Sequence, residues 1–195
     1  MTVEEYYGNA YEGLEETKRI LEGITERIRN GSHPDEDLQP VVYYCSRIKK
    51  PDSMIRKLEG RGFPTEADSA LKNVYDAVGI RLICSFAGDV LAVVQMLENH
   101  PGIEIVEKKD YLLNPKPNGY RSIHLCVRVK ETGLYAEIQV RTIAMDFWAT
   151  LEHQLKYKKD VRGEGLIRRE LKRCADEIAS VDLSMQTIRE IIREL

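Results

Sequence analysis

Residues 123–129 and 134–141 restrict the fold of this chain most, because apolar and polar side chains alternate strictly along both segments. Successive side chains of a β-strand point to opposite faces, so each segment is expected to bury one face and present the other. The short intervening stretch 131–133 contains a glycine, which predicts a β-hairpin. The polar face of that hairpin carries charged and hydrogen-bonding groups from His124, Cys126, Arg128, Glu137, Gln139 and Arg141.

The other segments predict helices and strands that interleave along the chain. Helices are expected at 3–29, 89–99, 143–158 and 166–195, and strands at 41–50, 79–86 and 103–109. Two short helices are expected after residue 50 and after residue 65, the first capped by Asp52 or Ser53 and the second by Thr65. About five strands and about six helices indicate an α+β fold, in which one mixed sheet is flanked by helices.

Size and charge narrow the class of protein. The 195 residues suit a single domain, 1–195, and 43% hydrophobic residues can supply its core. A net charge of −3 argues against a protein that coats nucleic acid through bulk positive charge. The chain has no apolar run near the roughly 20 residues of a membrane span, and its acidic start does not resemble a signal peptide. Four widely spaced cysteines favour reduced, buried thiols in a cytoplasm over structural zinc.

A stiff loop precedes the hairpin, with the sequence NPKPNGYR at 114–121. It brings Lys116, Asn118, Tyr120 and Arg121 close to the polar face of the hairpin. Nucleotides need cations for their phosphates and a flat partner for their base. Residues 47–61 and 107–128 are both locally basic, which suggests two phosphate groups and hence two nucleotides. A solvated outer face remains the alternative interpretation, and neither GxxxxGK[ST] nor GxGxxG occurs in the chain.

Four sequence blocks carry a family resemblance. They are SRIK at 46–49, DAVGIR at 76–81, KDYLLNPKPNGYRSIH at 109–124 and EIQVRTIAMDFWATLEH at 137–153. In this order they resemble the alarmone synthetase domain of the RelA/SpoT family, whose fold is nucleotidyltransferase-like. The chain length resembles the single-domain small synthetases, particularly the RelQ-type branch, with 41–158 as the catalytic core. His33-Pro34-Asp35 does not match the HD metal motif of the hydrolase domain in long members.

The resemblance implies a reaction and a role for individual residues. The family transfers the β,γ-pyrophosphate of ATP to the 3′-hydroxyl of GDP or GTP, which yields ppGpp or pppGpp and AMP. The donor ATP would be held by Arg47 and Arg81 at the adenine and by Lys49, Ser53 and Lys57 at the triphosphate. The acceptor would be bound by Tyr120, which stacks on guanine, and by Lys116, Asn118, His124, Gln139 and Ala149. Asp76 and Glu137 would hold Mg²⁺, and Glu137 would also take the proton of the 3′-hydroxyl.

Several points stay open at the level of sequence. Residues 107–110, EKKD, match neither the R-x-K-D nor the E-x-D-D pattern of relatives, so the preference between GDP and GTP is undetermined. One rival function is a catalytically silent sensor of guanine nucleotides or single-stranded RNA. Another is a pyrophosphokinase that uses adenine nucleotides as acceptors. Trp148, Glu152 and His153 are interpreted as core or salt-bridge residues of a helix rather than as site residues.

The C-terminal segment 164–195 carries an apolar seam at steps of three and four residues, formed by Ile167, Leu171, Cys174, Ile178, Val181, Met185, Ile188, Ile192 and Leu195. Such a seam is typical of a coiled coil and predicts an oligomerisation helix. Docking of the seam on its own domain is the alternative. The family resemblance implies a homotetramer, and it leaves an alarmone effector open as a further partner.

Overall fold

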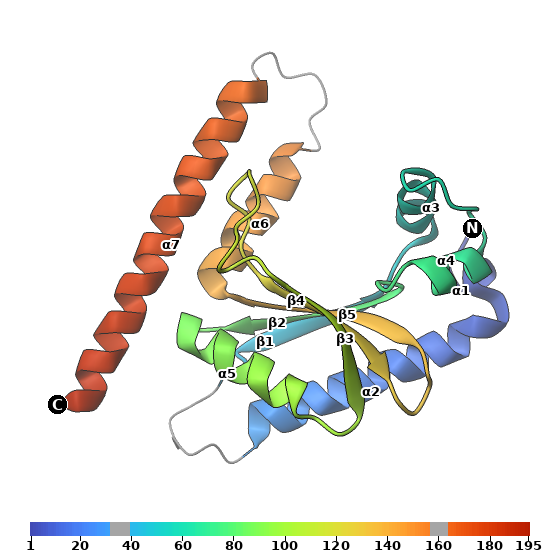
Figure 1. The fold of residues 1–195 in the computed structure, drawn as a ribbon, viewed down its shortest axis with the longest axis horizontal. Coiled ribbons are helices and arrows are strands. Elements are labelled where there is room, and N and C mark those ends of the chain that lie inside the picture. Colours follow the sequence, from blue (N-terminus) through green and yellow to red (C-terminus); the bar gives the residue numbers. More distant parts are fainter. Residues whose placement is uncertain (32–39, 157–163) are drawn as a thin grey trace.

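The computed structural model describes residues 1–31, 40–156 and 164–195, and its centre is a five-stranded mixed sheet (Figure 1). The strands follow the order β1-β2-β5-β4-β3, in which β2 and β5 run parallel and the other neighbours antiparallel. Their bounds are β1 Tyr43–Ile48, β2 Val78–Cys84, β3 Ile103–Asp110, β4 Ile123–Val129 and β5 Tyr135–Thr142. The predicted α+β class with a mixed sheet of about five strands is therefore confirmed.

Helices surround this sheet unevenly. They are α1 Val3–Tyr7, α2 Tyr11–Asn30, α3 Pro51–Glu59, α4 Ala67–Asn73, α5 Ala87–Glu98, α6 Ile143–Lys156 and α7 Glu164–Glu194, with a 3-10 turn η1 at Gly8–Ala10. Helices α2 and α5 pack on the sheet, and the apolar core lies between them and the strands (Figure 1). Helix α7 packs along α6 and against α5, to one side of the sheet. The opposite sheet face is therefore left to polar side chains.

The predicted hairpin is present as β4 and β5. Leu125 lies opposite Ile138 in the antiparallel register, and both are buried on the core face. Gly133 closes the turn with φ 71, a left-handed conformation that glycine adopts without the steric cost of a Cβ. The alternating pattern thus placed the polar residues of both strands on the face away from α2 and α5.

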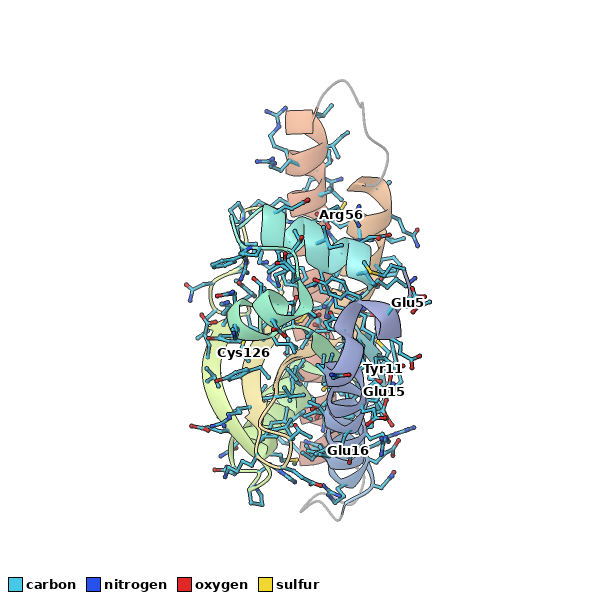
Figure 2. The ribbon with its side chains drawn as sticks, turned by 90° about the vertical axis from the view of Figure 1, so that its right-hand side faces the viewer. Glu5, Tyr11, Glu15, Glu16, Arg56 and Cys126 are labelled. Carbon is cyan, nitrogen blue, oxygen red and sulfur yellow. The ribbon has the colours of Figure 1, made fainter. Side chains whose placement is uncertain are left out.

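The N-terminal helix is interrupted, contrary to the prediction of one helix over 3–29. Gly8, with φ 52, ends α1, and the 3-10 turn η1 leads into α2. A side view shows Glu5 on α1 and Tyr11, Glu15 and Glu16 on α2, with Cys126 on the sheet (Figure 2). The end of α2 at Asn30 agrees with the predicted stop at Asn30-Gly31.

The predicted caps of the two short helices are wrong. Helix α3 starts with Pro51 at its first position after Lys50, and no side chain caps it. Proline fits this position because its ring presets φ and the amide it lacks would have no intrahelical partner. Helix α4 starts after Glu66 rather than Thr65, again without a side-chain cap.

The thiols are less uniformly buried than expected. Cys84 and Cys126 are buried, whereas Cys45 is exposed and Cys174 partly so, and all four are free. None of the helices in the described ranges is long and apolar enough to cross a membrane. The residues His33, Pro34 and Asp35 and the predicted helix end at 158 lie outside the described residues.

Candidate active site

Strand register arranges the polar side chains in two rows across the sheet. In the first row, Arg47 lies beside Gly79, Gly79 beside Glu137, and Glu137 beside Cys126. The second row contains Cys45, Arg81, Gln139 and His124 in the same strand order. Residues from four strands, far apart in the chain, therefore share one face, and each is held by a backbone ladder.

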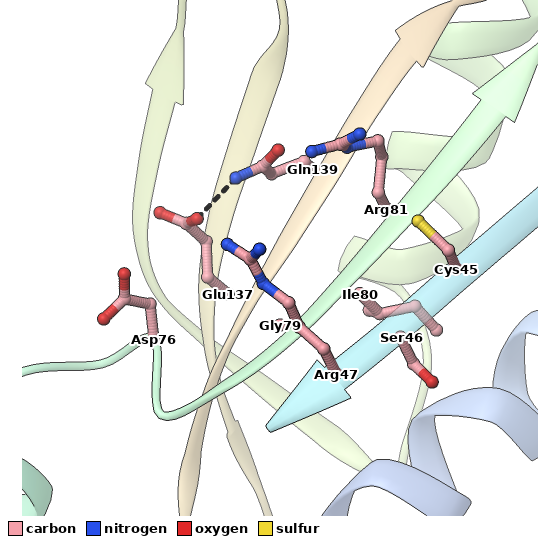
Figure 3. Close-up of a pocket in the computed structure, with 9 residues that line it drawn as sticks. All are labelled: Cys45, Ser46, Arg47, Asp76, Gly79, Ile80, Arg81, Glu137 and Gln139. Atoms are coloured by element: carbon pink, nitrogen blue, oxygen red, sulfur yellow. Dashed lines mark hydrogen bonds between the residues drawn. The ribbon is translucent and has the colours of Figure 1, made fainter. Parts of the chain in front are cut away.

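Two adjoining hollows open on this face. The smaller has a volume of about 160 Å³ and is lined by Cys45, Ser46, Arg47, Asp76, Gly79, Ile80, Arg81, Glu137 and Gln139 (Figure 3). The larger, about 410 Å³, is lined by Arg47, Arg81, Tyr120, Gln139, Arg141, Ala149, Thr150, Glu152, His153 and Gln154. The two hollows share Arg47, Arg81 and Gln139. Two ligands could therefore lie side by side with these three residues between them.

Asp76 lies just before β2 at the edge of the smaller hollow. Its Oδ2 accepts hydrogen bonds from Lys49 Nζ at 2.7 Å and from Lys57 Nζ at 2.5 Å. Burial opposes ionisation of this carboxyl, but the two ammonium groups outweigh it and hold the pKa of Asp76 below its usual value. The other oxygen, Oδ1, is buried without a hydrogen-bond partner. A buried carboxylate oxygen without a partner is available to a cation.

Glu137 lies in the middle of β5 and faces the same hollow. Its Oε1 is 3.3 Å from His124 Nδ1, and Gln139 Nε2 donates to Oε2 at 2.7 Å (Figure 3). Burial raises the pKa of this carboxyl, but the contacts with His124 and Gln139 lower it to about 2. Glu137 is therefore ionised at neutral pH. So low a pKa suits a metal ligand better than a strong proton acceptor.

The loop before β4 brings most of the predicted acceptor residues together. Tyr120 is central: its hydroxyl lies 2.8 Å from His124 Nε2 and accepts from an Arg141 amino group at 3.0 Å. Lys116 Nζ lies 5.1 Å from the centre of the Tyr120 ring. Asn118 donates its side-chain amide to Glu152 at 3.0 Å. Of this loop, Tyr120 lines the larger hollow, together with Gln139 and Ala149.

Not every predicted residue lines one of the two hollows, and Lys116, Asn118 and His124 line neither. Ser53 lies in the first turn of α3 and lines neither hollow. Lys49 and Lys57 are close to the smaller hollow but are paired with Asp76. The expectation for Trp148 is confirmed, since it is buried and donates to the Leu171 carbonyl. Glu152, interpreted as a core or salt-bridge residue, is buried, and both Glu152 and His153 also line the larger hollow because α6 lies beside β5.

Two residues of the site were missed by the sequence analysis. Arg141 continues the alternation of Glu137 and Gln139, so its place on the polar face was readable, but no role was assigned to it. It is 2% exposed and lies beside Tyr120. Asp146, in the first turn of α6, pairs with both Arg81 and Arg141. No local pattern marks Asp146, since its partners come from other segments.

Two adjoining hollows lined by arginines, one of them with two ionised carboxylates, indicate an enzyme that binds phosphorylated substrates, and the comparisons give its family. Residues 46–162 match the family described as "Region found in RelA / SpoT proteins". The GTP pyrophosphokinase YwaC of Bacillus subtilis is 38% identical over 157 residues, which is 77% of this chain and 75% of YwaC. The chain belongs to the RelA/SpoT family.

Solved structures place it among the small members of that family. Small alarmone synthetase 2 of Bacillus subtilis is similar with a TM-score of 0.80 at 34% identity, over 93% of this chain and 98% of that one. Small alarmone synthetase 1 of the same organism, bound to its product pppGpp, gives a TM-score of 0.77 at 29% identity, over 97% of both chains. The similarity thus spans the sheet and the flanking helices.

Proposed function

We propose that this chain is a small alarmone synthetase with GTP pyrophosphokinase activity. It transfers the β,γ-pyrophosphate of ATP to the 3′-hydroxyl of GDP or GTP, which forms ppGpp or pppGpp and AMP. The observation that carries this function is the pair of adjoining hollows around Glu137, Arg47 and Arg81, in a chain similar to the GTP pyrophosphokinase YwaC over three quarters of its length. Phosphoryl transfer depends on placement and charge neutralisation, and such a site supplies both.

The smaller hollow suits the donor. Arg47 and Arg81 stand on neighbouring strands at the boundary of the two hollows, where their planar guanidinium groups can stack on adenine. Lys49 and Lys57 lie next to it and would exchange Asp76 for the phosphates of ATP. Ser53 would contribute a hydroxyl from the start of α3. A cation that replaced the two lysines at Asp76 would keep that carboxylate neutralised.

Asp76 and Glu137 are the residues that would hold Mg²⁺. Both line the smaller hollow, both are ionised, and Asp76 Oδ1 is buried without a partner. Within the described ranges no cluster of three or more ligating side chains occurs, which fits Mg²⁺ held by two carboxylates and the substrate phosphates. The bound ion would neutralise the phosphates and acidify the attacking hydroxyl. Glu137 would accept the hydroxyl proton, aided by this acidification.

The larger hollow suits the acceptor. The Tyr120 hydroxyl is held by His124 and Arg141, which fixes the plane of a ring on which guanine would stack. Lys116 would bind the acceptor phosphates, and Asn118, Gln139 and the Ala149 backbone would contact base and ribose. Amide groups and backbone atoms can form hydrogen bonds with the polar edge of guanine. Adenine presents a different pattern of donors and acceptors on that edge.

Product analysis tests this function against its rivals. The protein is incubated with ATP and Mg²⁺ and, in turn, with GDP, GTP, GMP and AMP. The proposal predicts pyrophosphorylated guanosine products and equimolar AMP from GDP or GTP. A silent sensor of guanine nucleotides or single-stranded RNA would yield no product, and an adenine-nucleotide pyrophosphokinase would convert AMP instead. Comparison of the GDP and GTP rates also resolves the acceptor preference that residues 107–110 leave open.

Helix α7 is proposed to join copies of the chain in a cytoplasmic homotetramer, with 41–158 as the catalytic core and 164–195 as the oligomerisation helix. Its docked side buries Ala175 and Asp182 against the domain. On a neighbouring face of the helix, Val181, Met185, Ile188 and Ile192 are 60%, 47%, 49% and 66% exposed. Helix α7 therefore contacts its own domain through one set of residues and would pair with another copy of the chain through a different set. An alarmone effector between subunits would be a further partner.

Substitution of the exposed residues tests this assembly. Met185→Asp with Ile188→Asp places two carboxylates in the contact, where each must lose its charge or keep water in the interface. Light scattering is expected to show a fall from the oligomer mass to the monomer mass. Ser184→Asp with Thr187→Asp, also on exposed positions of α7, is the matched control and should keep the wild-type mass. A monomeric wild-type protein would contradict the assembly.

A further inference from the structure

Asp146 contacts three residues that stand on three different strands of the sheet. Its Oδ1 lies 3.2 Å from an Arg81 amino nitrogen and 3.4 Å from an Arg141 amino nitrogen. Its Oδ2 accepts the Tyr43 hydroxyl at 3.1 Å. The Asp146 side chain is only 14% exposed, so its carboxylate is partly shielded from water. One carboxylate of α6 thus bridges β1, β2 and β5.

The two arginines need such a bridge. Arg141 is nearly fully buried, and burial together with the nearby charge of Arg81 lowers its pKa, whereas Asp146 raises it. Two guanidinium groups packed this closely repel each other in a shielded site, and a shared carboxylate offsets that repulsion. The Nε atoms of both arginines are buried without a partner. Asp146 supplies the one carboxylate oxygen that an amino nitrogen of each arginine contacts.

Each arginine contacts residues of a different proposed nucleotide site. Arg81 borders the smaller hollow, in which the adenine of ATP is proposed to stack. Arg141 donates to the Tyr120 hydroxyl at 3.0 Å and also contacts Gln139, both on the acceptor side. We propose that Asp146 is a positioning residue. It would fix the position of Arg81 at the donor site relative to Arg141 and Tyr120 at the acceptor site. This inference rests on the proposed function, since it uses the two nucleotide sites assigned there.

Asp146→Asn tests the proposal because asparagine keeps the shape and removes the charge. Loss of a charge-assisted hydrogen bond is expected to raise the KM for ATP and the KM for the acceptor about tenfold each. Tyr43→Phe is the matched control, since it removes the third contact to the same carboxylate and changes no charge. It should keep both KM values within about twofold. Titration with a non-hydrolysable ATP analogue and, separately, with GDP reads both sites even if no product forms, which separates this proposal from the proposed function.

A double variant distinguishes positioning from a general structural role. In Asp146→Asn with Arg141→Gln, the like-charge pair disappears together with the carboxylate. ATP affinity should then return toward the wild-type value, while acceptor affinity stays low because Tyr120 has lost its arginine. The double variant also removes the repulsion that would destabilise the single one, so it is measurable where Asp146→Asn does not fold. Unchanged affinities in Asp146→Asn, a change at one site alone, or no recovery of ATP affinity in the double variant would overturn the proposal.

Discussion

The two halves of the site are supported differently. On the donor side, Arg47, Arg81 and Glu137 stand on neighbouring strands of a hydrogen-bonded sheet. On the acceptor side, Tyr120 lies on a loop that leans on α7, a helix that lies beside the sheet. The donor residues are therefore positioned by the sheet and, at Arg81, by Asp146 of α6, whereas the loop that carries Tyr120 also depends on its contact with α7.

The contact between loop and helix is close. A Cβ on Gly119 would lie 2.5 Å from the Ala175 Cβ, so only glycine allows this approach. Arg121 donates to the Ala175 carbonyl at 3.3 Å and to Asp176 at 3.0 Å. Elsewhere Thr142 donates to buried Asp182 at 2.6 Å, which anchors the same helix to the end of β5. A shift of α7 relative to the sheet is thus expected to lower the affinity for the acceptor nucleotide and to leave the affinity for ATP unchanged.

The largest effect is expected at Glu137, which lines the donor hollow and is proposed to take the proton of the acceptor hydroxyl. Glu137→Gln keeps the shape of the side chain and removes its charge and basicity. Loss of a general base alone costs about 10²–10⁴-fold in rate, and loss of a metal ligand adds to it. The turnover number for product formation measures the effect. Activity within tenfold of wild type would mean that another carboxylate serves the reaction.

Tyr120→Ala should weaken binding in the acceptor half of the site and leave binding in the donor half unchanged. Without the ring, acceptor affinity is expected to fall by about 1–3 kcal/mol, the range for base–aromatic stacking. The affinity for ATP should hardly change, because the donor residues lie on the strands. Calorimetric titration with GDP and with an ATP analogue gives both values. An equal loss of ATP affinity would contradict the division of the site into two halves.

A matched pair of glycine substitutions tests the support of the loop. Gly119→Ala adds a Cβ at φ 90 and against Ala175, and we expect the acceptor KM to rise about tenfold as the loop shifts. At Gly79, on the donor floor, a Cβ would meet only the Glu137 carbonyl oxygen, at 4.0 Å. Gly79→Ala should therefore fold normally and leave the acceptor KM unchanged. A rise in the acceptor KM of Gly79→Ala, or none in Gly119→Ala, would contradict the comparison.

The last expected effect is on stability rather than on activity, and it is a dependence on pH. The pKa of Glu137 is lower in the folded protein, about 2, than its ordinary value of 4.5. Its ionised form therefore stabilises the fold above pH 4.5, and this contribution is lost as the pH falls toward 2. The free energy of unfolding of wild type minus that of Glu137→Gln should fall by on the order of 1–3 kcal/mol between pH 6 and pH 3. Urea unfolding at both pH values measures it, and a constant difference would contradict the lowered pKa.

The strands and their polar face followed from the sequence because their signal is local. Alternation along 123–129 and 134–141 sets which side chains are buried, whatever the rest of the chain does. The resemblance then selected Asp76, Glu137 and Tyr120, which the fold brings to one face. The predictions of helix starts were less accurate. Pro51 presets the first turn of α3, so the carboxylate of Asp52 and the hydroxyl of Ser53, which suggested caps, do not cap the helix.

Other features depend on pairs of segments that the chain sequence keeps apart. Arg81 and Asp146 are 65 residues apart, and their contact exists only because α6 folds back over β2 and β5. The same holds for the apolar seam of α7, since docking through Ala175 and Asp182 determines which seam residues stay exposed. The low pKa of Glu137 also arises from a neighbouring strand, through His124. Periodicity acts within a segment, whereas charge pairing, close approach and burial act between segments, so packing alone determined these features.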